Sequence, residues 1–313
     1  MRRPPREHLR ALLPGALALA LAPGCATQGA ARDTNTAAAA EPACVTSLAG
    51  LLPRDATSFV LVRPRALFEH PRLGRALARA FDDATEEALL ERARRVGYDL
   101  RTLDRALLAW GPRGTVAVAL GAFDGRRITD LLWERLLTPR ARGAERGGVE
   151  RMEGTLVDTV VAVAVHASCG VAAWAEGDTR LVDRVLLPPE SPREDPSAWV
   201  LWRTRELPPR APVPRAVFDH VRWVTVRASP TNDGVRVSLH LDGALPEDTP
   251  ARLRATLRAV QGSPLGESVG APEWLHPDAV PITPEPHGVA LTVDLPWRAV
   301  DALAEALRGD ASL

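Results

Sequence analysis

The sequence predicts an α+β fold built of antiparallel or mixed sheets with helices packed on one face, arranged as two similar halves. The first observation is a recurring order in which an apolar strand, a turn residue and an amphipathic helix follow one another. The second is a strand over residues 235–241 in which apolar and polar side chains alternate. Such a strand has one buried and one solvated face, which favours an antiparallel sheet over a doubly wound parallel one.

The composition is that of an ordinary globular protein. The 313 residues are 46% hydrophobic and 25% charged, and 39 basic side chains, all of them arginine, balance 39 acidic ones. These figures exclude a chain disordered throughout, a collagen and a small disulfide-dense domain. Because no net positive charge is available to attract phosphate groups along a backbone, no nucleic-acid partner is expected.

The N-terminal segment, residues 1–24, has the three parts of an export signal. A positively charged start is followed by an apolar stretch over residues 11–22, and small residues close the segment. The positive charges are those of Arg2, Arg3, Arg6 and Arg10. The apolar stretch is shorter than the roughly 20 residues that a membrane-spanning helix needs. We therefore interpret the segment as a signal peptide that is removed.

The residues that close this signal, Leu21 to Cys25, resemble the lipobox of bacterial lipoproteins. Gly24 matches the small residue that precedes the acylated cysteine of that motif, whereas Ala22 stands where leucine is commonest. The resemblance implies that Cys25 is acylated and becomes the mature N-terminus, which would tether the protein to a membrane. The alternative is an ordinary cleaved signal with a cysteine at this position by chance.

The segment that starts at the anchor, residues 25–46, is predicted to be a flexible tether, because its residues are small and polar without apolar periodicity. Removal of the signal takes four arginines and Glu7, and leaves 35 basic and 38 acidic groups. Charge alone would therefore not hold the chain on an anionic membrane. Ala26 stands where enteric lipoproteins of the inner membrane carry an aspartate, which by analogy favours the outer membrane of the cell envelope.

The first half, residues 47–190, is predicted to alternate strands and helices. Its strands are apolar runs, and its helices carry apolar residues at three- and four-residue spacing. The helix starts are marked by aspartates that suit an N-cap. The expected elements are a strand at 58–62, helical stretches after Pro71 and from Thr85 to Gly97, a strand at 115–120, a helix after Asp124, a hairpin of strands 156–165 and 170–175, and a short helix after Asp178.

The second half, residues 197–313, follows a proline-rich boundary and repeats this style. Asn232-Asp233-Gly234 is a strong hairpin signal between two strands. Pro250 suits the first turn of the helix that comes next. The expected elements are strands at 221–227 and 235–241, a helix from Pro250, a strand at 289–293 and a C-terminal helix with Val300, Leu303, Ala304 and Leu307 on one face.

Two cysteines remain beyond the anchor, Cys44 and Cys169. An exported chain meets an oxidising compartment, so this pair is a possible disulfide. In the chain-entropy model a bridge that closes so long a loop is worth on the order of 5 kcal/mol. The alternative is two buried free thiols.

A search for chemistry-bearing motifs leads to no catalytic residues, no cofactor and no metal. His276, Asp278, Glu285 and His287 concentrate potential ligands, but without ligand spacing they are expected to belong to a solvated loop. The glycines of residues 121–125 lie between a strand and a helix, yet Asp124 places a negative charge where an anion would bind. That turn is therefore expected to cap a helix.

The stretch His166-Ala167-Ser168-Cys169 contains residue types found in nucleophile sites. No GxSxG elbow surrounds Ser168, however. His166 is also expected to lie too close to Cys169 along a strand to present its ring to that cysteine without a special turn. A disulfide partner and turn residues are the preferred interpretation.

The tryptophans are unusually frequent, with eight against a single tyrosine. Most lie at the ends of predicted elements and are expected in the core. Trp199 and Trp202, beside Arg203 and Arg205, could instead line a groove for a sugar or a partner protein.

Two short motifs resemble those of a group of uncharacterised envelope proteins and lipoproteins of high-GC Gram-negative bacteria. Leu52-Pro53-Arg54-Asp55 leads into a strand, and Gly121-Ala122-Phe123-Asp124 follows a later one. The resemblance covers about residues 51–187. It implies no activity, because the group has none established.

The sequence therefore leads to the hypothesis of a membrane-anchored envelope lipoprotein whose α+β domain is a non-catalytic binding or scaffolding module. Its expected partners are the membrane, through the lipid anchor, and an envelope protein or glycan. The alternative is an envelope hydrolase or small-ligand-binding enzyme with dispersed site residues. The candidates for that alternative are Asp219, His220, His276 and His287.

Overall fold

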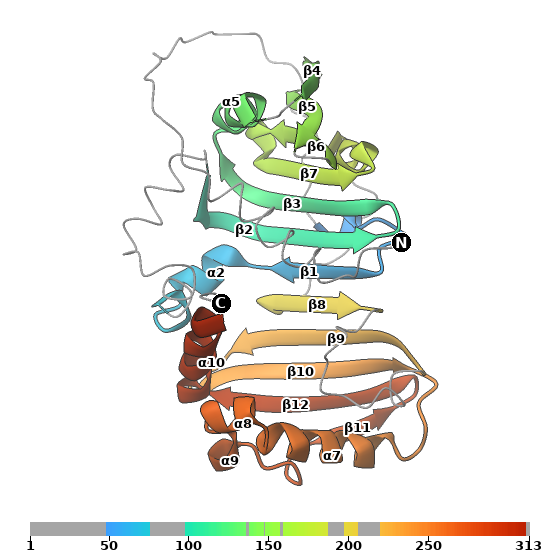
Figure 1. The fold of residues 1–313 in the computed structure, drawn as a ribbon, viewed down its shortest axis with the longest axis vertical. Coiled ribbons are helices and arrows are strands. Elements are labelled where there is room, and N and C mark those ends of the chain that lie inside the picture. The colour runs from blue at the N-terminus through green and yellow to red at the C-terminus, as the bar shows by residue number, and fades with distance from the viewer. Residues whose placement is uncertain are drawn as a thin grey trace. The chain divides into compact units, whose positions relative to one another are not determined.

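A computed structural model of the chain describes residues 48–75, 98–135, 138–146, 148–156, 159–186, 197–205 and 220–310 (Figure 1). The signal segment, Cys25, the tether and Cys44 lie outside the described residues. So do Asp219 and the helical stretch predicted from Thr85. Within the described ranges, no helix is both long enough and apolar enough to span a bilayer.

The chain divides into two compact units whose boundaries do not follow chain order. Unit 1 comprises residues 1–52, 86–103 and 114–195, and unit 2 comprises residues 53–85, 104–113 and 196–313. The proline-rich boundary near residue 196 is thus also a boundary between units. The halves predicted at 47–190 and 197–313 differ from these units, because residues 53–85 and 104–113 cluster with the C-terminal part of the chain.

Unit 2 is built on antiparallel strands. Their spatial order is β11 (Ile282–Glu285), β12 (Gly288–Pro296), β10 (Gly234–Gly243), β9 (Val221–Pro230), β8 (Val200–Thr204), β1 (Ser58–Val62) and β2 (Tyr98–Gly111), of which the residues from Asp104 onward belong to this unit. The predicted hairpin at Asn232-Asp233-Gly234 is confirmed, since β9 and β10 pair on either side of it. The pairing of β1 with β8 brings Ser58 opposite Thr204, which is 146 residues further along the chain.

Four helices follow or interrupt the last strands of unit 2. They are α7 (Thr249–Gln261), α8 (Pro264–Ser268), α9 (Ala271–Trp274) and α10 (Trp297–Asp310). Pro250 lies in the first turn of α7, as predicted, and the Gly262 amide caps its end by donating to the Arg258 carbonyl. A short helix α2 (Pro64–Glu69) follows β1.

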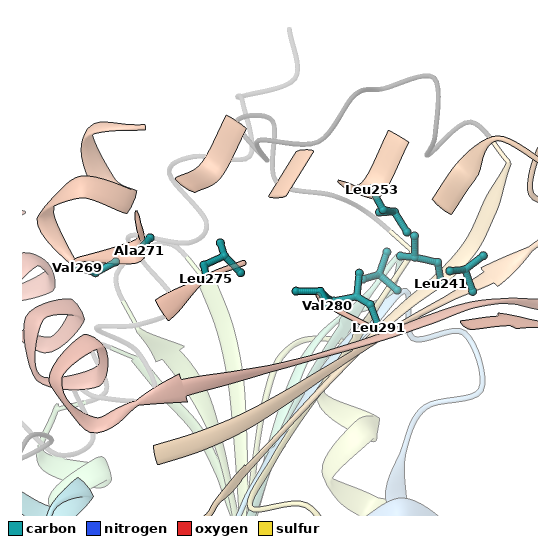
Figure 2. Close-up of a cluster of buried hydrophobic side chains, with 9 residues drawn as sticks. Leu241, Leu253, Val269, Ala271, Leu275, Val280 and Leu291 are labelled. Carbon is teal, nitrogen blue, oxygen red and sulfur yellow. The ribbon is translucent and has the colours of Figure 1, made fainter. Parts of the chain in front are cut away.

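The hydrophobic core of unit 2 combines strand and helix residues (Figure 2). Leu241 of β10 has no solvent exposure, and Leu291 of β12 lies beside it. Leu253 of α7 and Leu275, just after α9, reach the same cluster. The alternation predicted for residues 235–241 agrees with burial at two positions, since Leu241 is buried and Arg236 exposed, whereas the other residues of this stretch are all half-buried.

Unit 1 is also built on antiparallel strands. Their order is β3 (Gly114–Phe123), β7 (Val171–Gly177), β6 (Thr159–His166), β5 (Val149–Leu156) and β4 (Thr138–Arg146), and residues 98–103 of β2 belong to this unit as well. The helical segments are η1 (Leu48–Leu51), α5 (Gly125–Arg135), η2 (Ala167–Cys169) and η3 (Thr179–Leu186). Asp124 caps α5 as predicted, with Oδ1 accepting the Arg127 amide at 3.0 Å. The architecture of both units is therefore a strand-dominated α+β fold.

Helical segments lie on both faces of the strands in unit 1. Thr129 of α5 donates to Glu150 of β5 at 2.7 Å, and the next β5 residue, Arg151, donates to Asp183 of η3 at 3.0 Å. Consecutive strand residues point to opposite faces, so α5 and η3 cover different faces. This explains why every residue of β6 from Val161 to His166 is buried. The expectation of helices on one face does not hold for this unit.

We expect Thr204→Val to lower the free energy of unfolding by about 1–3 kcal/mol, as for other buried hydroxyls deprived of a partner. The Ser58 and Thr204 hydroxyls are hydrogen-bonded at 2.5 Å, and both residues are buried. Valine keeps the shape of threonine but leaves the Ser58 hydroxyl unpaired. Denaturant unfolding measures the change. Adding Ser58→Ala to this variant should recover part of the lost free energy of unfolding. A double variant whose loss equals the sum of the losses of the two single variants would contradict this explanation.

Candidate functional site

In the stretch at Cys169, the side chains of His166, Ser168 and Cys169 lie close together. The 3-10 turn η2 follows β6 and bends the chain back, so that His166 Nδ1 lies 3.1 Å from Ser168 Oγ and His166 Nε2 lies 3.4 Å from Cys169 Sγ. The His166 ring therefore reaches Cys169 through a special turn, the condition that the sequence analysis set for this approach.

This cluster is nevertheless a poor nucleophile site. Cys169 is disulfide-bonded, and a disulfide sulfur is not a thiolate. His166 is 6% exposed and its ring is enclosed by the turn. Because Cys44 lies outside the described residues, the pairing of Cys44 with Cys169 stays a prediction.

The dispersed histidines proposed for an enzyme are only partly brought together. His220 precedes β9 and His287 precedes β12, and both positions are at the same end of the strands of unit 2. The Gly243 amide donates to the His287 carbonyl at 2.9 Å there. His276 follows α9 and is exposed like the other two. Across the described residues, no hydrogen bond or ion pair links these three imidazoles, and no group of three potential ligands suits a metal ion.

Trp199 and Trp202, the pair suggested as an alternative lining of a groove, have different surroundings. Trp199 packs edge-on against His70 at a centroid distance of 5.8 Å. Trp202 is next to Arg203 on β8, so their side chains point to opposite faces. The two arginines, Arg203 and Arg205, meet a different tryptophan.

That tryptophan is Trp223 of β9. The guanidinium carbons of Arg203 and Arg205 lie 4.6 and 4.2 Å from the centroid of its ring, both within range of a cation–π contact. Arg203 also lies beside Asp242 of β10, with Nη2 3.6 Å from Oδ2. We call Arg203, Arg205, Trp223 and Asp242 the arginine–tryptophan cluster.

A histidine and a second carboxylate extend the cluster across the sheet. Asp242 Oδ1 lies 2.8 Å from His240 Nε2, and His240 Nδ1 lies 3.2 Å from Glu285 Oε2. His240 thus lies between two carboxylates, and its hydrogen bond with Asp242 helps to position that side chain.

Strand register explains how these residues meet. Trp223 is paired with Asp242, Asp242 with Gly288, and Gly288 with Glu285, so the four lie in one row across β9, β10, β12 and β11. The next row contains Arg203, Thr225 and His240. Residues in between, namely Val224, Leu241 and Val289, point to the other face and are buried in the core cluster of unit 2. The same alternation that buries the core therefore places this polar cluster on the opposite face.

The donors of the two arginines are incompletely used. Arg203 Nε is shielded from solvent and has no acceptor, and its contact with Asp242 is longer than a hydrogen bond. Arg205 is exposed, and no described carboxylate pairs with its guanidinium. By contrast, Arg236 of the same face binds Asp294 in a bidentate pair at 2.8 and 3.0 Å, which lowers the pKa of Asp294 through the hydrogen bond.

The sequence contains only part of the signal for this cluster. The spacing of Arg203 and Arg205 places both on one face at the end of β8, whereas the sequence alone indicates them only as neighbours of Trp199 and Trp202. Trp223, His240 and Asp242 were missed as partners, because only the register of β8, β9 and β10 brings them alongside.

Comparison with known protein families finds no matching family, and no curated protein sequence matches the chain significantly. Among solved structures, crystal form III of the protein TP0453 has a TM-score of 0.50 at 12% identity, covering 86% of this chain and all of that one. Crystal forms IV and I of the same protein give TM-scores of 0.46 and 0.47 at 11% and 12% identity, over 83% of this chain and 95% and 97% of those chains. At this identity the likeness to crystal form III shows a shared α+β fold.

Proposed function

We propose that the protein is a lipoprotein of the cell envelope, anchored through Cys25 in the outer membrane, whose α+β domain is a non-catalytic binding or scaffolding module. The observation that carries the anchor is the position of Cys25, at the end of an export-type signal and before a polar, small-residue tether. An acyl anchor also suits a mature chain that carries no excess of basic groups to bind anionic lipid.

The binding role rests on the surface of unit 2. In this unit we infer that helices cover one face of the strands, because α7 and the residues around α9 share the core cluster with β9, β10 and β12. The other face then offers the arginine–tryptophan cluster to a partner. Arginine and tryptophan are the side chains most enriched at binding hot spots, which favours this face for an envelope protein or a glycan.

We expect Cys25→Ser to abolish acylation and to release the protein from the membrane fraction, because the cysteine thiol is the acceptor of the lipid in the lipobox motif. Metabolic labelling with a palmitate analogue, followed by fractionation, measures both effects. Thr27→Ser is the control, since it changes a residue near Cys25 while the thiol stays, and it should keep label and location.

Two results would contradict the anchor. One is palmitate label that persists in the Cys25→Ser variant. The other is a wild-type protein that carries no label and is recovered in the soluble fraction.

A further inference from the structure

The strongest unassigned feature of the described residues is the pair of arginines at Trp223, because Arg203 Nε has no acceptor and no described carboxylate pairs with Arg205. We propose that Arg203 and Arg205 form a binding site for a phosphate group, carried by a lipid headgroup or by a soluble phosphate ester. The inference rests on the binding function proposed above and names the chemistry that its surface would recognise. It does not depend on the lipid anchor.

The stacking on Trp223 prepares both arginines for such a ligand. A cation–π contact uses the flat face of a guanidinium and leaves its N–H groups, which point outward in the plane, free to donate. The contact also restricts two long side chains before any ligand arrives, so less conformational entropy is lost on binding. Trp223 is thus occupied by the arginines, which makes it a support for a charged site.

The existing partners leave room for an acceptor. Arg203 makes one contact to a carboxylate, at 3.6 Å from Asp242, and Arg205 has its contact with Trp223. The Arg203 side chain is 38% exposed, and Arg205 is exposed as well. The Arg203 Nε donor is withdrawn from water without an acceptor, which is costly, so an anion that supplies an oxygen to it would be favoured.

The surrounding charges permit an anion at Arg205. Asp242 faces Arg203, but its carboxylate is shared with His240. Glu285 belongs to β11, four strand spacings from β8, or about 19 Å at the usual separation of strands. Arg227, exposed on the same face of β9, has no partner among the described carboxylates and adds positive charge. Asp242 and Glu285 therefore lie on the β10 and β11 side of the cluster, away from β8.

A phosphate fits the arrangement better than a single carboxylate. Both guanidinium carbons contact one ring, so their separation cannot exceed the sum of their centroid distances, about 8.8 Å. Each guanidinium presents a planar fork that binds two oxygens. A phosphate offers several acceptor oxygens in different directions and a charge of about −1.5 to −2 as a monoester, so it can be shared by two forks.

The test uses the unanchored Cys25→Ser chain, so that lipid binding does not come from the anchor. Inorganic phosphate is titrated calorimetrically, and flotation is measured with vesicles of phosphatidylcholine alone or mixed with phosphatidylglycerol. Arg205→Gln should weaken phosphate binding on the order of ten- to a hundredfold, as expected for loss of charge-assisted hydrogen bonds. Arg203→Gln/Arg205→Gln should abolish it.

The matched control is Arg236→Gln, because Arg236 is an exposed arginine of the same face whose donors already bind Asp294. It should bind phosphate like the parent chain, and circular dichroism should show all variants folded. If the protein floats only with the vesicles that contain phosphatidylglycerol, and if this flotation requires Arg205, the ligand is a lipid headgroup. Phosphate binding without flotation would identify a soluble ester.

Either of two results would overturn the site. One is a folded parent chain that binds neither phosphate at millimolar concentration nor anionic vesicles. The other is an equal loss of binding in Arg205→Gln and Arg236→Gln, which would indicate diffuse surface charge. These results leave the palmitate experiment unaffected, so failure of the site and failure of the anchor are distinguishable.

Discussion

Replacing Trp297 with alanine should lower the free energy of unfolding by about 3–5 kcal/mol, the usual cost of truncating a buried tryptophan. Trp297 is 7% exposed and begins α10. Its ring stacks on His70, at a centroid distance of 4.9 Å. Its Nε1 donates to the Asn232 carbonyl in the β9–β10 turn at 3.0 Å. The side chain thus connects three segments of unit 2 that are far apart in the chain.

Denaturant unfolding followed by circular dichroism measures this loss. Trp297→Phe is the control, because phenylalanine keeps an aromatic ring and loses the hydrogen bond, which should cost about 1 kcal/mol plus some packing. An alanine variant within about 1 kcal/mol of the parent would mean that Trp297 does not hold these segments together.

Leu241→Ala is expected to cost about 2–5 kcal/mol, because it removes buried methyl groups and leaves a cavity. Leu241 has no exposed surface and lies within the core cluster, beside Leu291 and below Leu253 of α7 (Figure 2). β10 cannot easily move into the gap, since strand pairing on both sides fixes its backbone.

The same unfolding experiment tests this expectation. Leu295→Ala is the matched control: Leu295 is a leucine of the neighbouring strand β12, partly exposed and outside the cluster, so its truncation should cost less. Equal losses in the two variants would contradict a core centred on Leu241.

The two compact units of the structure differ from the two halves predicted from the order of elements along the chain. The strand at residues 58–62 begins the N-terminal half in sequence, yet it pairs with β8 in unit 2. Neither β8 nor β2 was predicted as a strand. The apolar residues of β2, such as Leu100, Leu103 and Leu107, also satisfy helical spacing, so periodicity alone does not identify it.

Local features were predictable because their causes are local. The hairpin at Asn232-Asp233-Gly234 depends on residues that tolerate a tight turn. The start of α5 depends on the Asp124 carboxylate, which accepts a hydrogen bond from the amide of Arg127, three residues later. The turn at Cys169 is the exception. There a 3-10 turn brings Cys169 back to the His166 ring, which residue spacing along an extended strand does not show.

The sequence by itself determined the globular α+β character of the chain and the face on which each half-buried strand places its polar residues, since both follow from the period of its side chains. Only the tertiary structure decided that Arg203 and Arg205 meet Trp223, and that His240 lies between Asp242 and Glu285. These contacts join four strands whose register is set by burial of the opposite face, a long-range condition that no single segment encodes.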